Sequence, residues 1–273
     1  MKDKYSAVVL DIDHTLLNSE RKITDYTLQS LKICADKGIL PYIATARPQR
    51  LVFRTSEALS EADFLKERGA FYNGASAIDK TLDYSKNWTM PANIVNSVIE
   101  YLINKNNDIY IAIQRKDETH SFLKPFNDSD LVNWGITQSD LISFDIASNE
   151  ECSKIVAWQE FGNMTDIYYK LNEKFGEDIN VFITDSASWI QIMSNEASKE
   201  NALIDLLALR NIPSDEVIVF GDDMPDIGML AFFGHSVAMG NSGDSVKSVA
   251  KYVTKSNDED GIAYALKEFF GII

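Results

Sequence analysis

The chain has little of the chemistry that cysteine and histidine provide. Its 273 residues include two cysteines, Cys34 and Cys152, and three histidines, His14, His120 and His235, which are scattered along the sequence. Neither residue type has the close spacing of a zinc site, and two distant cysteines do not make a disulfide framework. A protein without structural disulfides suits a reducing compartment, so we expect the chain in the cytoplasm.

Basic residues are scarce relative to acidic ones. Lys and Arg number 26 against 41 Asp and Glu, which gives a formal net charge of −15. Nucleic acids and anionic membranes both attract basic surfaces, so neither is an expected partner. No stretch approaches the roughly 20 apolar residues that span a bilayer, and the N-terminus has no secretory signal pattern. We therefore expect a soluble protein that acts on a molecule in solution.

Short apolar runs alternate with helix-like segments at both ends of the chain. Continuous apolar runs are typical of parallel strands that are buried on both faces. The alternation of strands and helices predicts a doubly wound α/β sheet. We expect strands at 6–10, 39–44, 70–72, 216–220, 236–239 and 252–254, and helices at 25–37, after Pro48, and at 199–209, 224–233, 245–250 and 261–270.

The middle of the chain has a different pattern. Helices are expected at 94–103, 129–135 and 164–176, and strands at 109–114, 153–159, 179–184 and 189–193. All four tryptophans, Trp88, Trp134, Trp158 and Trp189, fall in this part. We expect an inserted α+β domain at 81–189 whose own core contains the tryptophans, and a discontinuous domain formed by residues 1–80 and 190–273.

Polar clusters follow three of the expected strands. They are Asp11-Ile-Asp-His-Thr15, Thr45-Ala-Arg47 and Gly221-Asp-Asp-Met-Pro-Asp226. In open α/β sheets, ligands bind beyond the carboxyl ends of the strands. If these strands are neighbours, as many as five carboxylates converge there, which is costly unless a cation is present or some are protonated. A hard cation with oxygen ligands, Mg²⁺, fits this group best.

A metal held by carboxylates suits phosphate chemistry. The metal screens the phosphoryl group, so that a carboxylate such as Asp11 can attack phosphorus and form an aspartyl-phosphate. Asp13, two residues on, can protonate the leaving oxygen and later deprotonate a water. Thr45, Ala46 and Lys199 are the candidates for binding the phosphoryl oxygens.

These motifs, in this order, resemble those of the haloacid dehalogenase superfamily. Asp11-Ile-Asp-His-Thr15, Thr45-Ala-Arg47, Lys199 and Gly221-Asp-Asp-Met-Pro-Asp226 look like its four motifs. The chain is also similar to the Cof-type sugar-phosphate phosphatases in the segments Asn73-Gly-Ala75, Ala238-Met-Gly-Asn241 and Asn257-Asp-Glu-Asp-Gly-Ile262. The resemblance implies a Rossmann-like hydrolase core, with a large cap inserted between the second and third motifs.

The resemblance also implies roles for individual residues. Asp11 corresponds to the nucleophile and to a Mg²⁺ ligand. Asp13 corresponds to the general acid and base, with its backbone carbonyl on the metal. Thr45 and Lys199 correspond to the residues that hold the phosphoryl group, and Lys199 would also offset the charge of Asp11.

Two further carboxylates and two departures from the family pattern complete the expected site. Asp222 and Asp226 correspond to the metal-side carboxylates, with Asp222 as the more direct ligand. Asn241 is a weaker candidate for the site, because a role in its own turn explains the residue equally well. Family members usually have glycine at His14, whose side chain we expect to point outward. They usually have asparagine at Pro225, and proline offers neither a side-chain donor nor an N–H.

Three functions fit this sequence. The first is a hydrolase for small phosphate esters, in particular sugar phosphates, with the cap closing over the substrate. The second is a phosphomutase, since the same Asp11 chemistry serves both reactions. The third is a phosphate-binding regulatory protein with weakened turnover, which Pro225 alone supports.

Overall fold

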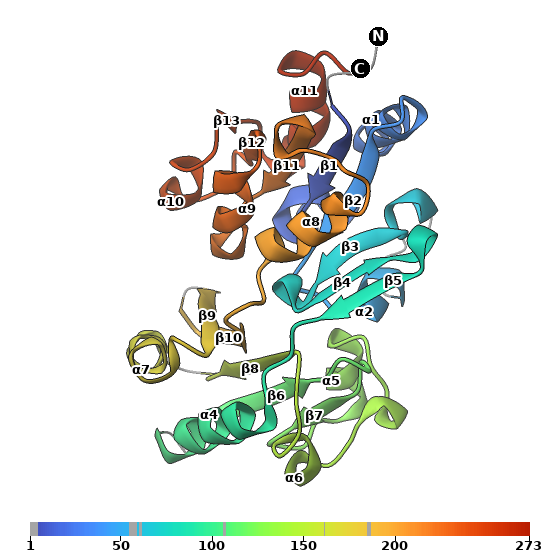
Figure 1. Cartoon of the computed structure of the whole chain (residues 1–273). Coiled ribbons are helices and arrows are strands. Elements are labelled where there is room, and N and C mark those ends of the chain that lie inside the picture. The colour runs from blue at the N-terminus through green and yellow to red at the C-terminus, as the bar shows by residue number, and fades with distance from the viewer. Residues whose placement is uncertain (1–4, 55–58, 60–61, 106–107, 161, 185–186) are drawn as a thin grey trace. The chain divides into compact units, whose positions relative to one another are not determined.

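The protein forms two compact units, drawn together in Figure 1. The structure is a computed structural model that describes residues 5–54, 59, 62–105, 108–160, 162–184 and 187–273. The core unit consists of Met1–Lys86 and Lys199–Ile273, and the inserted unit consists of Asn87–Ser198. Both borders lie later in the chain than the expected insertion at 81–189. Strand β5 (Tyr84–Asn87) still extends the sheet of the core, and strand β10 (Trp189–Ser194) of the insertion continues beyond residue 189.

The core unit is built on an eight-stranded, mostly parallel sheet. Its strand order is β13-β12-β11-β1-β2-β3-β4-β5, with β1 at the centre. Strands β1 and β11 are completely buried, as expected for parallel strands covered on both faces. The pair β3–β4 is antiparallel. The remaining strands are β2 (Leu40–Ala44), β3 (Arg68–Phe71), β4 (Ser76–Asp79), β12 (His235–Ala238) and β13 (Tyr252–Val253), with β1 at Ala7–Leu10 and β11 at Val217–Gly221.

Helices connect these strands, and their ends follow local sequence signals. Thr24 is the N-cap of α1 (Asp25–Asp36), and its side-chain oxygen accepts a hydrogen bond from the backbone N–H of Thr27. Gly38 follows the helix with φ +80°, a conformation that glycine adopts readily. The other core helices are α2 (Gln49–Arg54), α8 (Lys199–Ala208), α9 (Ile227–Phe232), α10 (Asp244–Lys247) and α11 (Gly261–Glu268).

The inserted unit contains a separate five-stranded antiparallel sheet. Its order is β7-β6-β8-β10-β9. The strands are β6 (Tyr110–Gln114), β7 (His120–Phe122), β8 (Lys154–Trp158), β9 (Ile179–Thr184) and β10 (Trp189–Ser194), and the helices are α4 (Ala92–Lys105), α5 (Asp128–Asn133), α6 (Phe144–Ala147) and α7 (Thr165–Phe175). The expected α/β fold with a separate α+β insertion is thus observed.

The two faces of the inserted sheet have different packing. Alternating residues of the strands, such as Ile111 and Ile155, join a core with the apolar residues of α4 and α7. The intervening residues form an aromatic cluster in which Trp158 and Trp189 stack with ring centroids 4.8 Å apart. Trp134 packs against both of these rings. Three of the four tryptophans therefore pack together, but on the face opposite the core that α4 and α7 cover, and of the four only Trp158 is buried. The expectation that the tryptophans form the main core of the insertion was wrong.

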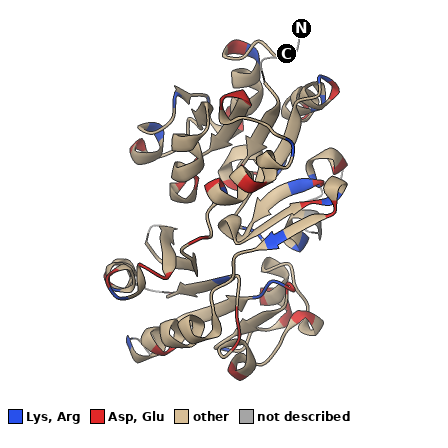
Figure 2. Cartoon of the chain, in the orientation of Figure 1, with Lys and Arg blue, Asp and Glu red and all other residues tan. Residues whose placement is uncertain are grey.

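Acidic residues lie on both units, as the red segments of Figure 2 show. Among the described residues, no helix combines the length and the apolar character that crossing a membrane requires.

Candidate active site

The site begins where the two central parallel strands of the core end. Strand β1 pairs with β11 in a register that places Leu10 beside Phe220, and the N–H of Asp11 donates to the carbonyl of Phe220 at 3.1 Å. Asp11 therefore leaves the sheet next to Gly221 and Asp222, the residues at the end of β11. Two motifs that lie more than 200 residues apart in sequence meet because their strands are neighbours.

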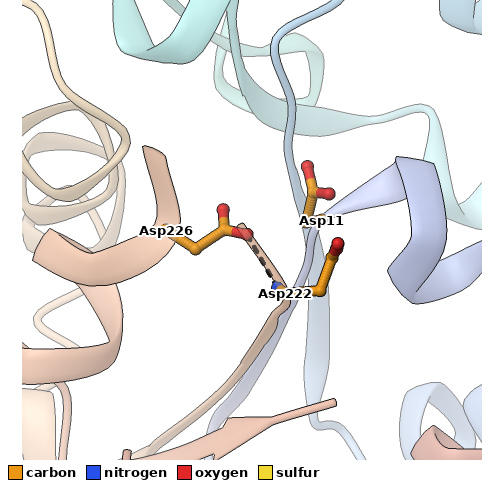
Figure 3. A group of neighbouring side chains, drawn as sticks. All are labelled: Asp11, Asp222 and Asp226. Atoms are coloured by element: carbon orange, nitrogen blue, oxygen red, sulfur yellow. Dashed lines mark hydrogen bonds between the residues drawn. The ribbon is translucent and has the colours of Figure 1, made fainter. Parts of the chain in front are cut away.

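Three carboxylates converge at this edge of the sheet. Asp11, Asp222 and Asp226 each offer an oxygen, and these oxygens all lie within 4.8 Å of one another. Figure 3 shows the side chains of Asp11 and Asp222 rising side by side from the ends of their strands, with Asp226 approaching from the turn at Met224–Asp226. The donor set consists of oxygen atoms only, which is the set that Mg²⁺ prefers.

Lys199 neutralises part of this charge. It is the first residue of α8 and is 3% exposed, and its Nζ lies 2.7 Å from Oδ1 of Asp11 and 2.6 Å from Oδ1 of Asp226. Burial alone would lower the pKa of Lys199, but the charges of the two carboxylates outweigh burial and raise it. Lys199 is therefore a fixed cation beside the predicted nucleophile.

Asp226 uses both of its carboxylate oxygens within the protein. Oδ1 accepts from Lys199, while Oδ2 accepts from the backbone N–H groups of Asp222 at 2.9 Å and of Asp223 at 3.1 Å. Gly221 allows this arrangement, because a Cβ at that position would lie 2.6 Å from the Cβ of Asp226. Asp226 thus organises the loop that presents Asp222, in addition to facing the carboxylate group.

Burial makes two of the carboxylates unusually basic. Burial is the largest effect on Asp222 and, with the charge of Asp226, raises its pKa to about 7. Burial also raises the pKa of Asp11 well above its usual value, although Lys199 opposes this change. Burial disfavours the negatively charged form of a carboxylate, and a divalent cation bound among such groups stabilises that form. The residues present therefore fit a magnesium ion, which Asp11 and Asp222 would hold.

Asp13 has a partner that sequence reasoning did not assign. Arg47 forms a two-pronged ion pair with it, with Nε 2.7 Å from Oδ2 and Nη2 in contact with Oδ1. The Thr45-Ala-Arg47 motif pointed to this residue without giving it a role. A planar guanidinium that grips both oxygens orients the Asp13 carboxylate, which a lysine cannot do equally well.

Thr45 and Ala46 follow β2, the strand on the other side of β1. The Thr45 side chain is completely buried, and its hydroxyl accepts from the N–H of Arg47 at 3.2 Å. The N–H of Asn73 donates to the carbonyl of Thr45 at 2.9 Å, which explains the Asn73-Gly74 turn near the site. Binding of phosphate by Thr45, Ala46 and Lys199 stays a prediction.

Thr15 is a second residue that sequence reasoning missed. Its buried hydroxyl donates to Oδ1 of Asp222 at 2.6 Å. This hydrogen bond joins the first motif to the loop that follows β11. The only available signal was its place in the first motif, where a threonine hydroxyl at helical spacing resembles an ordinary capping group. His14, in contrast, has an exposed side chain, as expected.

Comparison with known families agrees with this geometry. The model of the haloacid dehalogenase-like hydrolases matches residues 8–266. The chain belongs to this family. The matched range includes the whole inserted unit and all of the core unit except residues 1–7 and 267–273. The resemblance inferred from the motifs is therefore confirmed over nearly the entire chain.

Individual family members match over their full length. A 5-amino-6-(5-phospho-D-ribitylamino)uracil phosphatase from Bacillus subtilis is 25% identical over 283 residues, covering 100% of each chain. A subclass IIB sugar phosphatase superposes with a TM-score of 0.82 at 23% identity, covering 98% of this chain and 100% of the other. A haloacid dehalogenase-like hydrolase from Bacteroides thetaiotaomicron superposes with a TM-score of 0.77 at 24% identity, covering 97% and 100%.

These matches confirm two expectations. The structural likeness confirms the fold, a mostly parallel α/β core with a separate antiparallel insertion. The family and its phosphatase members confirm the enzyme class, a hydrolase of phosphoric monoester bonds.

Proposed function

We propose that the protein is a magnesium-dependent phosphatase for small phosphorylated metabolites, with Asp11 as its nucleophile. The observation that carries the proposal is the position of Asp11, buried at a strand end between the ammonium group of Lys199 and the carboxylate of Asp222. Asp13 lies two residues away with its carboxylate oriented by Arg47. The proposed nucleophile and its cationic neighbour meet at the end of β1, and the proposed acid–base group follows two residues later in the same segment.

In the first step, a carboxylate oxygen of Asp11 attacks phosphorus. The bond from phosphorus to the ester oxygen breaks, and Asp13 gives a proton to the leaving oxygen. Lys199, held 2.7 Å from Asp11, keeps that carboxylate in place and offers positive charge to the phosphoryl oxygens. Bound Mg²⁺ supplies the charge that lets an anionic nucleophile approach an anionic phosphate.

In the second step, water releases the phosphate. Asp13 takes a proton from the water, whose oxygen attacks phosphorus, and the bond between phosphorus and the Asp11 oxygen breaks. Asp13 thereby returns to the protonated form that the next cycle needs. Arg47 contacts both oxygens while Asp13 is a carboxylate. When Asp13 carries the proton, the contact to the unprotonated oxygen still holds the group on the same side of the site.

The substrate we propose is a phosphorylated sugar or polyol. Support comes from the relatives, since one is named for a phosphoribityl compound and another as a sugar phosphatase. The net charge of −15 argues against a nucleic-acid substrate. The two cysteines are buried free thiols, in keeping with our proposal of a cytoplasmic enzyme.

The first test is hydrolysis of p-nitrophenyl phosphate with Mg²⁺ and with a chelator. We expect turnover that the chelator abolishes and that Asp11→Asn eliminates without loss of fold. Turnover retained in Asp11→Asn would refute the assignment of Asp11 as the nucleophile. No magnesium-dependent hydrolysis of this ester or of any member of a sugar-phosphate panel would refute the phosphatase and favour the regulatory alternative. Transfer of the phosphoryl group to a second sugar hydroxyl would indicate a phosphomutase instead.

A further inference from the structure

The segment that carries Asp11 and Asp13 has an irregular backbone. We call Asp11–Ser19 the catalytic loop. It contains a π-helical turn at Ile12–Leu16 in which Asp13 has φ −74° and ψ 127° and His14 has φ 59° and ψ 8°, both outside helical values. A left-handed conformation is unfavourable for a residue with a side chain, so surrounding contacts must hold it.

Three side chains from the C-terminal part of the chain bind this loop. Nδ2 of Asn241 donates to the carbonyl of His14 at 2.9 Å, and Nδ2 of Asn257 donates to the carbonyl of Leu17 at 3.0 Å. The carboxylate of Asp258 accepts from the N–H and the hydroxyl of Ser19, both at 2.7 Å. The contacts cover the loop from its left-handed residue to its end.

The three side chains form one unit, which we call the clamp. The N–H of Asn257 donates to Oδ1 of Asn241 at 3.1 Å, so the amide of Asn241 bridges the two segments. The segments also meet through their backbones, because the N–H of Gly240 donates to the carbonyl of Lys255 at 2.9 Å. A Cβ at Gly240 would lie 2.7 Å from the nitrogen of Ser256, so the contact requires glycine.

We propose that Asn241, Asn257 and Asp258 are positioning residues that hold the catalytic loop in its active conformation. This inference rests on the phosphatase function proposed above. The carbonyl of His14 directly follows Asp13, so releasing it lets the left-handed turn relax and move the Asp13 backbone and carboxylate. A misplacement of about 1 Å at a reacting group can cost roughly 100-fold in rate. The clamp thus gives a function to two sequence segments that the reaction chemistry does not use.

The test replaces a donor by an acceptor of the same shape. Asn241→Asp cannot donate to the His14 carbonyl but can still accept from Asn257. We expect kcat for p-nitrophenyl phosphate to fall roughly 10- to 100-fold, as for other supporting contacts around a site, while KM changes less than about threefold. We also expect hydrogen exchange of the amides at 12–19 to become about fivefold to tenfold faster, as for the loss of one hydrogen bond.

Asn149→Asp is the matched control. Asn149 is also exposed, its Nδ2 donates to a backbone carbonyl (that of Asp145, at 2.9 Å), and its Oδ1 accepts from Asn96 at 3.2 Å. The control therefore makes the same chemical change with the same added charge, in the inserted unit. We expect no change in kcat and none in exchange at 12–19. An equal fall in kcat for both variants would overturn the proposal.

Hydrogen exchange needs no substrate, so the two proposals can fail separately. If the wild-type protein shows no turnover, the proposed phosphatase function is refuted. If hydrogen exchange at 12–19 is unchanged in Asn241→Asp, the proposed role of the clamp is refuted. Faster exchange in β1 and β11 as well would show that Asn241→Asp has unfolded. In that case the test uses Asp258→Ala, a substitution at an exposed position, in place of Asn241→Asp. For Asp258→Ala we expect faster exchange confined to the end of the loop and a lower kcat. Wild-type values for both quantities would overturn the proposal.

Discussion

The ammonium group of Lys199 lies between Asp11 and Asp226, 2.7 Å and 2.6 Å from their respective Oδ1 atoms. All three side chains are almost completely buried. One cation therefore holds both the predicted nucleophile and the carboxylate that organises the Gly221–Asp226 loop. Loss of the Lys199 ammonium group should therefore lower both the catalytic activity and the unfolding free energy.

Replacing Lys199 by methionine tests that dependence. The substitution leaves two buried carboxylates without their shared cation, which in comparable buried pairs costs about 3–5 kcal/mol of unfolding free energy. We expect urea denaturation to show a loss of this size, and no measurable hydrolysis of p-nitrophenyl phosphate. Lys267→Met removes an equal charge from an exposed lysine of the same unit and should change neither quantity. Full activity in Lys199→Met would contradict the assigned role.

The pKa of Asp222 predicts how metal-free stability depends on pH. Burial, followed by the charge of Asp226, raises this pKa from 3.8 to about 7. Between these values the folded protein binds a proton that the unfolded chain releases, so Asp222 lowers stability as pH rises toward about 7 and has no further effect above it. In chelator, Asp222→Asn should therefore gain stability relative to wild type across this range.

Metal binding should show the complementary pH dependence. Since Mg²⁺ competes with the proton on Asp222, we expect it to raise the Tm of the wild type more at about pH 8 than at about pH 5.5. Asp36→Asn removes an exposed carboxylate from α1 and serves as the control for net charge. A magnesium effect independent of pH, or one equal in Asp222→Asn and wild type, would contradict Asp222 as a ligand.

A methyl group at Gly221 should disable the site. The Cβ of Gly221→Ala would lie 2.6 Å from the Cβ and 2.7 Å from Oδ2 of Asp226, so that side chain must move. Overpacking of this kind costs about 1–3 kcal/mol. We expect kcat to fall strongly and, in kinetic titrations of the remaining activity, half-maximal rates to need a higher Mg²⁺ concentration than in the wild type. At Gly243 a Cβ meets nothing within 4 Å, so Gly243→Ala should behave as wild type.

Arg47 should matter most when the leaving group needs a proton. Arg47→Lys keeps the charge but loses the two-pronged grip on Asp13. We expect kcat for an alkyl phosphate to fall roughly tenfold or more, within the range that general acid catalysis contributes. The fall for p-nitrophenyl phosphate should be much smaller, because its leaving group is a weak base. Equal losses for both esters would show that Arg47 does not act through Asp13.

Sequence patterns predicted most strands of the fold, including the edge strands β9 and β13, and missed three others. Strand β1 lies inside the expected range 6–10, and α1 begins after Thr24 as expected. Strands β4, β5 and β7 were not predicted. β5 is mostly exposed and has no apolar run, and β7 has only three residues, so their pairing depends on the neighbouring strand rather than on their own composition.

The residues of the site also fall into a predictable and an unpredictable group. The acidic residues could be predicted because each follows a recognisable buried strand. The partners of these residues could not: Arg47 is 34 residues from Asp13, and Thr15 is 207 residues from Asp222. Which donor meets which carboxylate depends on strand order and on an irregular backbone at His14, neither of which residue spacing encodes.

Pro225 should stabilise its loop and limit the rate of the reaction. It occupies the turn at Met224–Asp226, whose first residues suit the fixed φ of proline, and the preceding Asp223 forms a capping box with Asp226. Pro225→Asn should therefore lower the unfolding free energy by about 0.4–1 kcal/mol. The same variant adds the amide that family members usually carry, so we expect its kcat to rise severalfold. Pro225→Ala relaxes the same turn without adding an amide, and it should lose stability while kcat stays at the wild-type value. A kcat that rises equally in both variants would assign the effect to relaxation of the turn, and one that rises in neither would show that the site functions without this contact.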